Sequence, residues 1–147
     1  MKRRTASRLT GLLLLALTPL HGQANLLDAP TDAREVNPIE VGATTPDVSL
    51  TQADGTAVRL HELAAEQPAV LVFYRGGWCP YCSTQLSGLG VIEDSLRDLG
   101  FRVHAVSPDK PENVAAAAEE ADFDYALYSD ASAEAAHAFG LAFRVDA

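Results

Sequence analysis

The amino-acid sequence predicts an α/β fold in which an N-terminal β-hairpin extends a parallel sheet. Short runs rich in β-branched and aromatic residues alternate with stretches of helical periodicity, in the order hairpin, β, α, β, α, β, α. Strands that alternate with helices pair in parallel through right-handed crossovers. Residues 41–147 supply one domain's worth of chain.

The hairpin is predicted over residues 46–60. Residues 46–50 alternate apolar and polar side chains, and residues 57–60 form the returning strand. Asp54-Gly55 lies between them, and this dipeptide suits the positive φ of a hairpin turn. One helical turn is expected at residues 61–65.

The next segment predicts a buried, central parallel strand over residues 69–74, with the sequence Ala-Val-Leu-Val-Phe-Tyr. Gly76-Gly77 forms a flexible break, and Pro80 suits the first turn of a helix. One long helix is then expected because five apolar residues recur at helical spacing before Gly100: Leu86, Leu89, Ile92, Leu96 and Leu99.

The remainder predicts two further strand–helix units. A strand over residues 101–107 precedes a capping box at 109–112 and a helix over 114–120. A strand over residues 123–128 precedes Ser129-Asp130, which is expected to cap a helix over 133–139 that Gly140 ends. No chemistry is assigned to His61, in the helical turn at residues 61–65, or to His104 and His137 in this region.

Residues 1–24 predict a secretory signal peptide, and residues 25–40 a polar linker. The leader has a basic start, a short apolar core over residues 9–17 and small residues before a cleavage site after Ala24. Its core is too short to span a bilayer, so we expect a secreted or periplasmic protein without stable membrane insertion. Cleavage removes four of the 11 basic residues and none of the 20 acidic ones, which leaves a formal charge of −13. This charge argues against binding to nucleic acid.

The candidate active site is Cys79-Pro80-Tyr81-Cys82, which contains both cysteines of the chain. It lies where the strand over 69–74 gives way to a helix. A helix N-terminus stabilises an anion and lowers a thiol pKa, and Arg75 adds positive charge. Trp78 and Tyr81 are expected to shield the site, to form a docking surface or only to pack.

The motif favours redox chemistry, and the alternatives are a structural disulfide and a zinc site. A disulfide across one turn closes a small ring, which adds little chain-entropy stabilisation. Zinc usually has four ligands, and the chain has no second ligand pair at finger spacing. No metal, nucleotide or haem cofactor is expected.

An ordered set of short motifs runs from about Val41 to the last residue: Pro46-Asp47, Asp54-Gly55, residues 70–74, residues 79–82, residues 106–109, Ser129-Asp130 and residues 138–140. Through these motifs the chain resembles the alkyl hydroperoxide reductase/thiol-specific antioxidant (AhpC/TSA) family, and in particular its peroxiredoxin-like branch. The resemblance implies a thioredoxin-like fold for residues 41–147.

The resemblance supports two different assignments of the attacking cysteine. In this family the attacking cysteine stands three residues after a threonine, which matches Cys82, with Cys79 in the threonine's place. The motif also resembles the Cys-Pro-Tyr-Cys of glutaredoxins and the Trp-Cys-x-x-Cys of thioredoxins, where the first cysteine attacks. A proline common at the start of the loop is replaced by Arg75.

The resemblance further implies that the fold is C-terminally incomplete. The family continues with a strand preceded by a cis-proline, another strand, a final helix and a catalytic arginine, whereas this sequence stops at Ala147. We expect the isolated chain to be unstable, because an apolar sheet edge would be left uncovered. A cooperative thermal transition of the monomer would contradict this expectation.

The expected function is a thiol-dependent peroxidase that reduces hydrogen peroxide or alkyl hydroperoxides, with a thioredoxin-like dithiol protein as its reductant. One alternative is a thiol–disulfide oxidoreductase that acts on protein disulfides through Cys79. The other is a non-catalytic thioredoxin-like module or a truncated remnant. A homodimer is compatible with the sequence, which leaves the oligomeric state and the peroxide open.

Overall fold

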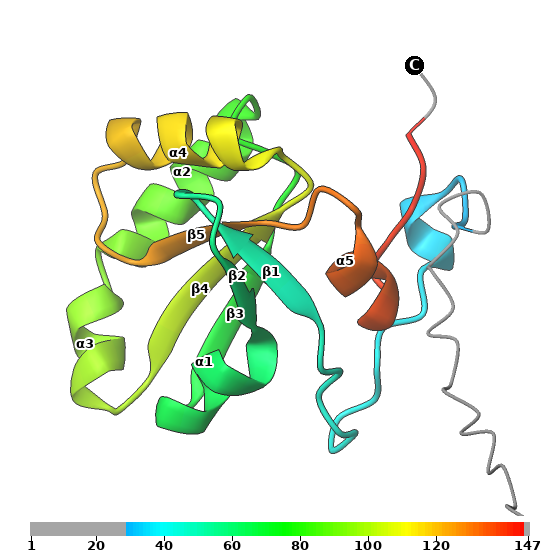
Figure 1. The fold of residues 1–147 in the computed structure, drawn as a ribbon, viewed down its shortest axis with the longest axis horizontal. Coiled ribbons are helices and arrows are strands. Elements are labelled where there is room, and N and C mark those ends of the chain that lie inside the picture. The colour runs from blue at the N-terminus through cyan, green and yellow to red at the C-terminus, as the bar shows by residue number, and fades with distance from the viewer. Residues whose placement is uncertain (1–28, 146–147) are drawn as a thin grey trace, which may run out of the picture.

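The computed structural model describes residues 29–145 (Figure 1). The predicted leader and the first four residues of the linker lie outside this range. The elements are, in chain order, η2 Ala33–Glu35, β1 Ser49–Gln52, β2 Ala57–Arg59, α1 Leu60–Glu66, β3 Ala69–Phe73, α2 Pro80–Gly90, α3 Glu93–Asp98, β4 Arg102–Ser107, α4 Pro111–Glu120, β5 Ala126–Ser129 and α5 Glu134–Ala138.

The strands form one five-stranded sheet in the order β2-β1-β5-β4-β3. β3, β4 and β5 are parallel, and the β1–β2 hairpin joins the sheet through antiparallel pairing of β1 with β5. Gly55 in the hairpin turn has a φ of 86°, as the Asp-Gly pair predicts. The predicted α/β class and hairpin are therefore confirmed.

The position of β3 differs from the prediction. Its continuous apolar sequence predicts a central strand, but β3 is the edge strand of the sheet formed by the described residues. All five of its residues are half-buried. Helices cover both faces of the sheet, which explains the apolar side chains on both faces of β3, while its outer edge pairs with no strand among residues 29–145.

Helices lie on both faces of the sheet (Figure 1). One core contains side chains from α2, α3 and α4, including Leu86, Leu96 and Val114, packed against Val103 and Leu127 of the sheet. The other core contains Leu60 of α1 and Ala135 and Phe139 from the α5 region, packed against the opposite face. Both cores come together at β4 and β5, which are the most deeply buried strands.

The single long helix predicted after Cys82 is wrong, because the structure has two helices. α2 ends at Gly90 and α3 begins at Glu93. Glycine is a poor helix former, and a Cβ at Gly90 would lie 2.7 Å from the Cβ of Phe123, which packs against this bare backbone. The break turns Ile92 and Leu99 outward, where they are 46% and 73% exposed.

The capping box predicted at residues 109–112 is also wrong. Lys110 is the N-cap of α4, with Pro111 at the first helical position and no side-chain cap. The Asp109 carboxylate instead accepts hydrogen bonds from the Gly77 backbone and the Ser107 hydroxyl. The predicted proline position is confirmed, while Asp109 faces the end of β3.

The predicted cap of α5 by Ser129-Asp130 is confirmed only in part: the N-cap residue is Ala133, but Asp130 binds the first turn of the helix. Its carboxylate accepts hydrogen bonds from the backbone N–H groups of Ala135 (3.0 Å) and Ala136 (2.9 Å). Gly140 ends this region with a φ of 67°, and a Cβ there would collide with the backbone of Asn37. This contact joins the C-terminal region to the segment that precedes the hairpin.

Residues 29–40 lie alongside residues 139–145 (Figure 1). The backbone N–H of Ile39 donates to the Phe139 carbonyl at 3.2 Å, and that of Arg144 donates to the Pro30 carbonyl at 2.7 Å. η2 is the only helix in residues 29–40, and Ala29 is buried. None of the helices within residues 29–145 is long and apolar enough to cross a membrane.

Asp130 generates a prediction about stability and pH. Burial raises the pKa of its carboxyl, against the backbone hydrogen bonds that lower it. A carboxyl with a raised pKa in the folded state contributes stability at acid pH, and this contribution is lost as pH rises through the folded-state pKa. Asn carries no charge and has one oxygen, which can accept one of the two backbone N–H groups. We expect the stability of Asp130→Asn relative to wild type to rise between acid and neutral pH, and Asp130→Ala to lose about 1 kcal/mol.

Urea unfolding of the three proteins at several pH values measures this effect. The difference in unfolding free energy between Asp130→Asn and wild type should shift in favour of the variant from acid to neutral pH. A shift in favour of wild type over this range would show that the carboxylate is stabilised rather than penalised in the folded state.

Candidate active site

The dithiol loop, residues 75–79, connects the carboxyl end of β3 to the amino end of α2. Parallel pairing continues one residue beyond β3, because the Tyr74 backbone N–H donates to the Val106 carbonyl at 2.9 Å. The chain then turns through Gly76, which has a φ of 144°. Cys79 is the N-cap of α2 and Pro80 its first residue, as predicted, which places Cys82 in the first helical turn.

The two cysteines are free and lie in different surroundings. Cys79 is buried and Cys82 is half-buried against the core beneath α2. A hydrogen bond with the Cys82 thiol, with further help from the Cys82 backbone N–H and the charge of Arg75, lowers the pKa of Cys79. Burial and the hydrogen bond to Cys79 raise the pKa of Cys82, although hydrogen bonding from the Arg75 backbone opposes this.

These opposite shifts make Cys79 the more acidic of the two thiols. The first proton lost from the dithiol leaves a thiolate on Cys79 that the remaining Cys82 S–H group stabilises. This arrangement activates one thiol at the expense of the other. Transfer of the Cys82 proton to a Cys79 thiolate would move the negative charge to Cys82.

Arg75 and Trp78 pack on one another above the loop. The Arg75 guanidinium lies 5.0 Å from the centroid of the Trp78 ring, a cation–π contact. The indole also lies against Gly76, where a Cβ would collide with its Nε1 atom. Because glycine has no Cβ, Gly76 can adopt the positive φ and leaves room for the Trp78 ring to pack against it.

The predicted aromatic residues are exposed around the dithiol. Trp78 is 65% exposed and Tyr81 is 88% exposed, so neither serves mainly as core packing. The structure therefore brings all six predicted site residues to one loop and one helical turn: Arg75, Trp78, Cys79, Pro80, Tyr81 and Cys82.

Sequence reasoning assigned no site role to Tyr74 or Asp109. The Tyr74 hydroxyl is buried, and burial, with smaller contributions from the charges of Asp109 and Cys82, raises its pKa. Asp109 contacts the loop from the end of β4. Their positions in the sequence could have indicated a place near the dithiol, because Tyr74 and Asp109 follow neighbouring parallel strands, β3 and β4. Residues that follow such strands lie at the same edge of a sheet.

A cavity of about 750 Å³ adjoins the loop. Arg75 and Trp78 line one side of it, and most of its remaining walls are apolar, including Leu71, Phe73 and Phe143. It therefore has space and chemistry for an apolar group next to the dithiol loop.

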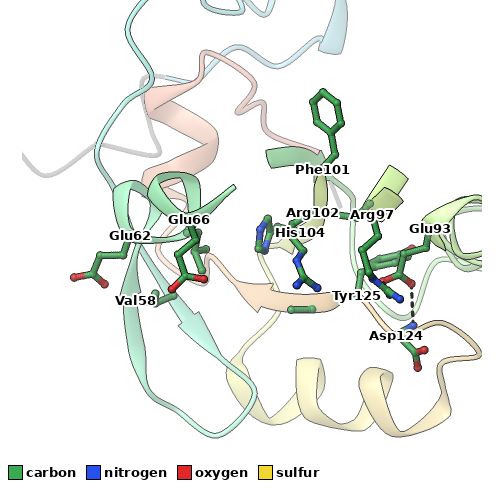
Figure 2. A pocket seen from close by; sticks show the side chains of 13 residues that line it. Val58, Glu62, Glu66, Glu93, Arg97, Phe101, Arg102, His104, Asp124 and Tyr125 are labelled. Carbon is green, nitrogen blue, oxygen red and sulfur yellow. Dashed lines mark hydrogen bonds and ion pairs between the residues drawn. The ribbon is translucent and has the colours of Figure 1, made fainter. Parts of the chain in front are cut away.

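A second cavity, of about 500 Å³, lies at the opposite end of the sheet (Figure 2). Its lining includes residues at the starts of β4 and β5, such as Arg102 and His104, and neither cysteine lines it or the first cavity. The Nδ1 atom of His104 lies 3.2 Å from the Tyr128 hydroxyl, and burial lowers the pKa of this histidine. Across residues 29–145, no group of three or more His, Cys, Asp or Glu side chains is placed to hold a metal ion.

A Cys-x-x-Cys pair at the amino end of a helix, joined to the carboxyl end of a parallel strand, defines a dithiol redox protein with a thioredoxin-like fold. The sequence profile of the AhpC/TSA family matches residues 41–145. The chain therefore belongs to the AhpC/TSA family, as its motifs predict.

Individual relatives agree with this assignment. Peroxiredoxin Bcp of Escherichia coli (strain K12) is 31% identical over 106 residues, which are 72% of this chain and 67% of the relative. The crystal structure of peroxidoxin BcpB from Mycobacterium tuberculosis matches with a TM-score of 0.64 and 31% identity, over 67% of this chain and 64% of that one.

Reduced Prx3 from Vibrio vulnificus, solved in complex with H₂O₂, matches with a TM-score of 0.65 and 27% identity, over 69% of this chain and 68% of that one. The chain thus spans about two thirds of the length of these relatives.

The unequal thiols generate a prediction. The ultraviolet absorbance of thiolate, followed against pH, should show a first group in wild type that titrates below the usual cysteine range. Cys79→Ser should abolish this group. Cys82→Ala should raise the pKa of Cys79 because it removes the hydrogen bond that lowers it most, and Cys82→Ser should raise it less because serine keeps an O–H donor. A low-pH group that survives in Cys79→Ser would place the charge on Cys82 instead.

Proposed function

We propose that the protein is a thiol-dependent peroxidase that reduces hydroperoxides with the Cys79–Cys82 pair. The observation that carries the proposal is the pair of free cysteines at the amino end of α2, with Cys79 at the N-cap and Cys82 in the first turn. Its membership of the AhpC/TSA family and its likeness to proteins named peroxiredoxins support this chemistry over other uses of a dithiol.

The proposed cycle begins with a proton transfer. Cys82 passes its proton to Cys79 along their hydrogen bond and attacks the distal oxygen of ROOH as a thiolate. The O–O bond breaks, Cys82 becomes a sulfenic acid, and RO⁻ leaves and is protonated to ROH. The Cys79 thiol then attacks the sulfenic sulfur, which forms the disulfide and releases water. A dithiol protein reduces this disulfide by exchange and is itself oxidised.

Arg75 and the loop backbone support Cys82 in this role. The Arg75 side chain favours a negative charge on either thiol, and its backbone N–H lowers the pKa of Cys82. The spacing that resembles the family motif also assigns attack to Cys82. Tyr81 and Trp78 provide an exposed aromatic surface on which a thioredoxin-like reductant would dock.

A second candidate is a thiol–disulfide oxidoreductase in which Cys79 attacks a protein disulfide and Cys82 resolves the mixed disulfide. The lowered pKa of Cys79, and its place as N-cap, favour this assignment. The two candidates use the same pair in opposite order, so their reactions with peroxide distinguish them.

The substrate is proposed to be hydrogen peroxide or an alkyl hydroperoxide. The apolar cavity of about 750 Å³ beside Arg75 and Trp78 supports acceptance of an organic group. Hydrogen peroxide is small and polar and needs only access to the thiols. Comparing the oxidation rates with hydrogen peroxide and with an alkyl hydroperoxide would therefore measure the contribution of the cavity.

Single-turnover oxidation tests the proposed peroxidase. The reduced mature chain is mixed with one equivalent of hydrogen peroxide, and sulfenate and disulfide are followed in wild type, Cys79→Ser and Cys82→Ser. We expect fast disulfide formation in wild type and no fast reaction in Cys82→Ser. In Cys79→Ser we expect a trapped sulfenate that forms more slowly, because serine cannot take the Cys82 proton. The physical reason is that only Cys82 attacks the peroxide and only Cys79 resolves its product.

Two results would contradict this assignment. A trapped sulfenate in Cys82→Ser, with Cys79→Ser inert, would reverse the cysteine roles. Wild type that reacts with peroxide no faster than a free thiol, yet exchanges rapidly with a protein disulfide through Cys79, would make the protein a dithiol oxidoreductase.

The site of action is proposed to be periplasmic or extracellular, on the strength of the leader over residues 1–24. Export would require a reductant in the same compartment, where disulfides persist. Expression of the full chain in a bacterial host, followed by fractionation and mass spectrometry, should yield a periplasmic chain that begins at Asn25. A cytoplasmic chain that retains residues 1–24 would refute export.

A further inference from the structure

We propose that Asp109 is a positioning residue for the dithiol: it holds the loop over residues 75–79 in its reactive geometry by accepting the Gly77 backbone hydrogen bond. The inference deepens the proposed function and rests on it. It concerns a residue that lies outside the Cys-Pro-Tyr-Cys motif by more than 25 positions in sequence but contacts the loop directly.

The carboxylate lies against the part of the loop that has no side chains. Asp109 Oδ2 accepts a hydrogen bond from the Gly77 N–H at 2.7 Å. A Cβ built on Gly76 would lie 2.9 Å from Asp109 Oδ1, so the carboxylate also occupies the space beside this glycine. Charge-assisted hydrogen bonds of this length are among the stronger ones in proteins.

Asp109 is itself held by the ends of two strands. The Ser107 hydroxyl, at the end of β4, donates to Asp109 Oδ2 at 3.2 Å. The Ser129 hydroxyl, at the end of β5, donates to the Asp109 carbonyl at 2.6 Å. Ser107 and Ser129 are both almost fully buried. The residue therefore transmits the rigidity of two central strands to a loop that begins at an edge strand.

The loop also contacts both cysteines, so fixing the loop restrains them. Gly76, next to the anchored Gly77, accepts a hydrogen bond from the Cys79 backbone N–H at 3.1 Å. At the other end of the loop, the Arg75 backbone N–H acts on Cys82. Releasing Gly77 would loosen both contacts, and small displacements of a nucleophile from its reactive geometry slow a reaction strongly.

The electrostatics exclude a role for Asp109 as a direct stabiliser of the thiolate. A carboxylate repels a nearby thiolate and so disfavours its formation. Any gain in reactivity that depends on Asp109 must therefore come from geometry. The limiting rate constant at high pH distinguishes the two roles. At that pH the thiolate is already fully formed, so a residue that acts by positioning still changes the rate constant, whereas one that only lowers the thiol pKa does not.

The test compares Asp109→Ala, Asp109→Asn and the charge-matched control Asp124→Ala in the full mature chain. Asp124 is exposed, and its side chain makes no hydrogen bond in the described structure. Two rate constants are measured across pH: oxidation by hydrogen peroxide in a single turnover, and alkylation of the dithiol by iodoacetamide. Urea unfolding of each variant accompanies them.

We expect Asp109→Ala to lower both limiting rate constants at high pH by about tenfold. Asp109→Asn should restore most of the loss, because its carboxamide oxygen can still accept the Gly77 N–H. Asp124→Ala should behave as wild type. If Asp109→Ala does not fold, Ser107→Ala provides the second measurement, since it removes one anchor of the carboxylate and should lower the limiting rates in part.

The inference is overturned if Asp109→Ala, or Ser107→Ala in its place, reacts at the wild-type limiting rate. It is also overturned if Asp109→Asn is as slow as Asp109→Ala, because charge rather than the hydrogen bond would then matter. Wild type that fails to react with peroxide would refute the proposed peroxidase, while the alkylation rates would still decide the role of Asp109.

Discussion

Parallel pairing of β3, β4 and β5 is the constraint on which the rest of the site depends. Because the three strands run in one direction, the segments that follow them emerge at the same edge of the sheet. The pairing continues beyond the strands themselves, through the Tyr74 N–H to the Val106 carbonyl and the Asp130 N–H to the Ser107 carbonyl. The dithiol, Asp109 and the cap of α5 are neighbours for this reason, although the sequence separates them.

The two-residue spacing of the cysteines places one sulfur at the N-cap of α2 and the other in its first turn. The hydrogen bond with Cys82 lowers the pKa of Cys79, whereas burial raises the pKa of Cys82, so chemically identical thiols acquire opposite pKa shifts. Such a pair can be used in either direction, depending on which sulfur a substrate reaches. Access and docking around Trp78 and Tyr81, rather than the intrinsic acidity of the thiols alone, would then decide the chemistry.

Local patterns predicted most of the fold. The backbone conformations that proline and glycine permit explain Pro80 at the start of α2 and Gly55 in the hairpin turn. The position of Asp130 follows from the ability of its carboxylate to accept backbone hydrogen bonds at α5. The failures are non-local. Helical periodicity could not reveal that Phe123 packs against Gly90, and a capping pattern could not reveal that Asp109 is drawn to Gly77 instead. The edge position of β3 depends on which strands are its neighbours, which its own sequence does not specify.

The place of Trp78 has a spectroscopic consequence. It is the one tryptophan in the chain, and it lies against Gly76, beneath the Arg75 guanidinium and next to Cys79. Intrinsic tryptophan emission therefore originates entirely within the dithiol loop. A change in that emission on oxidation, docking or loop release would report a local event at the site, whereas unfolding elsewhere would be seen only through tyrosine.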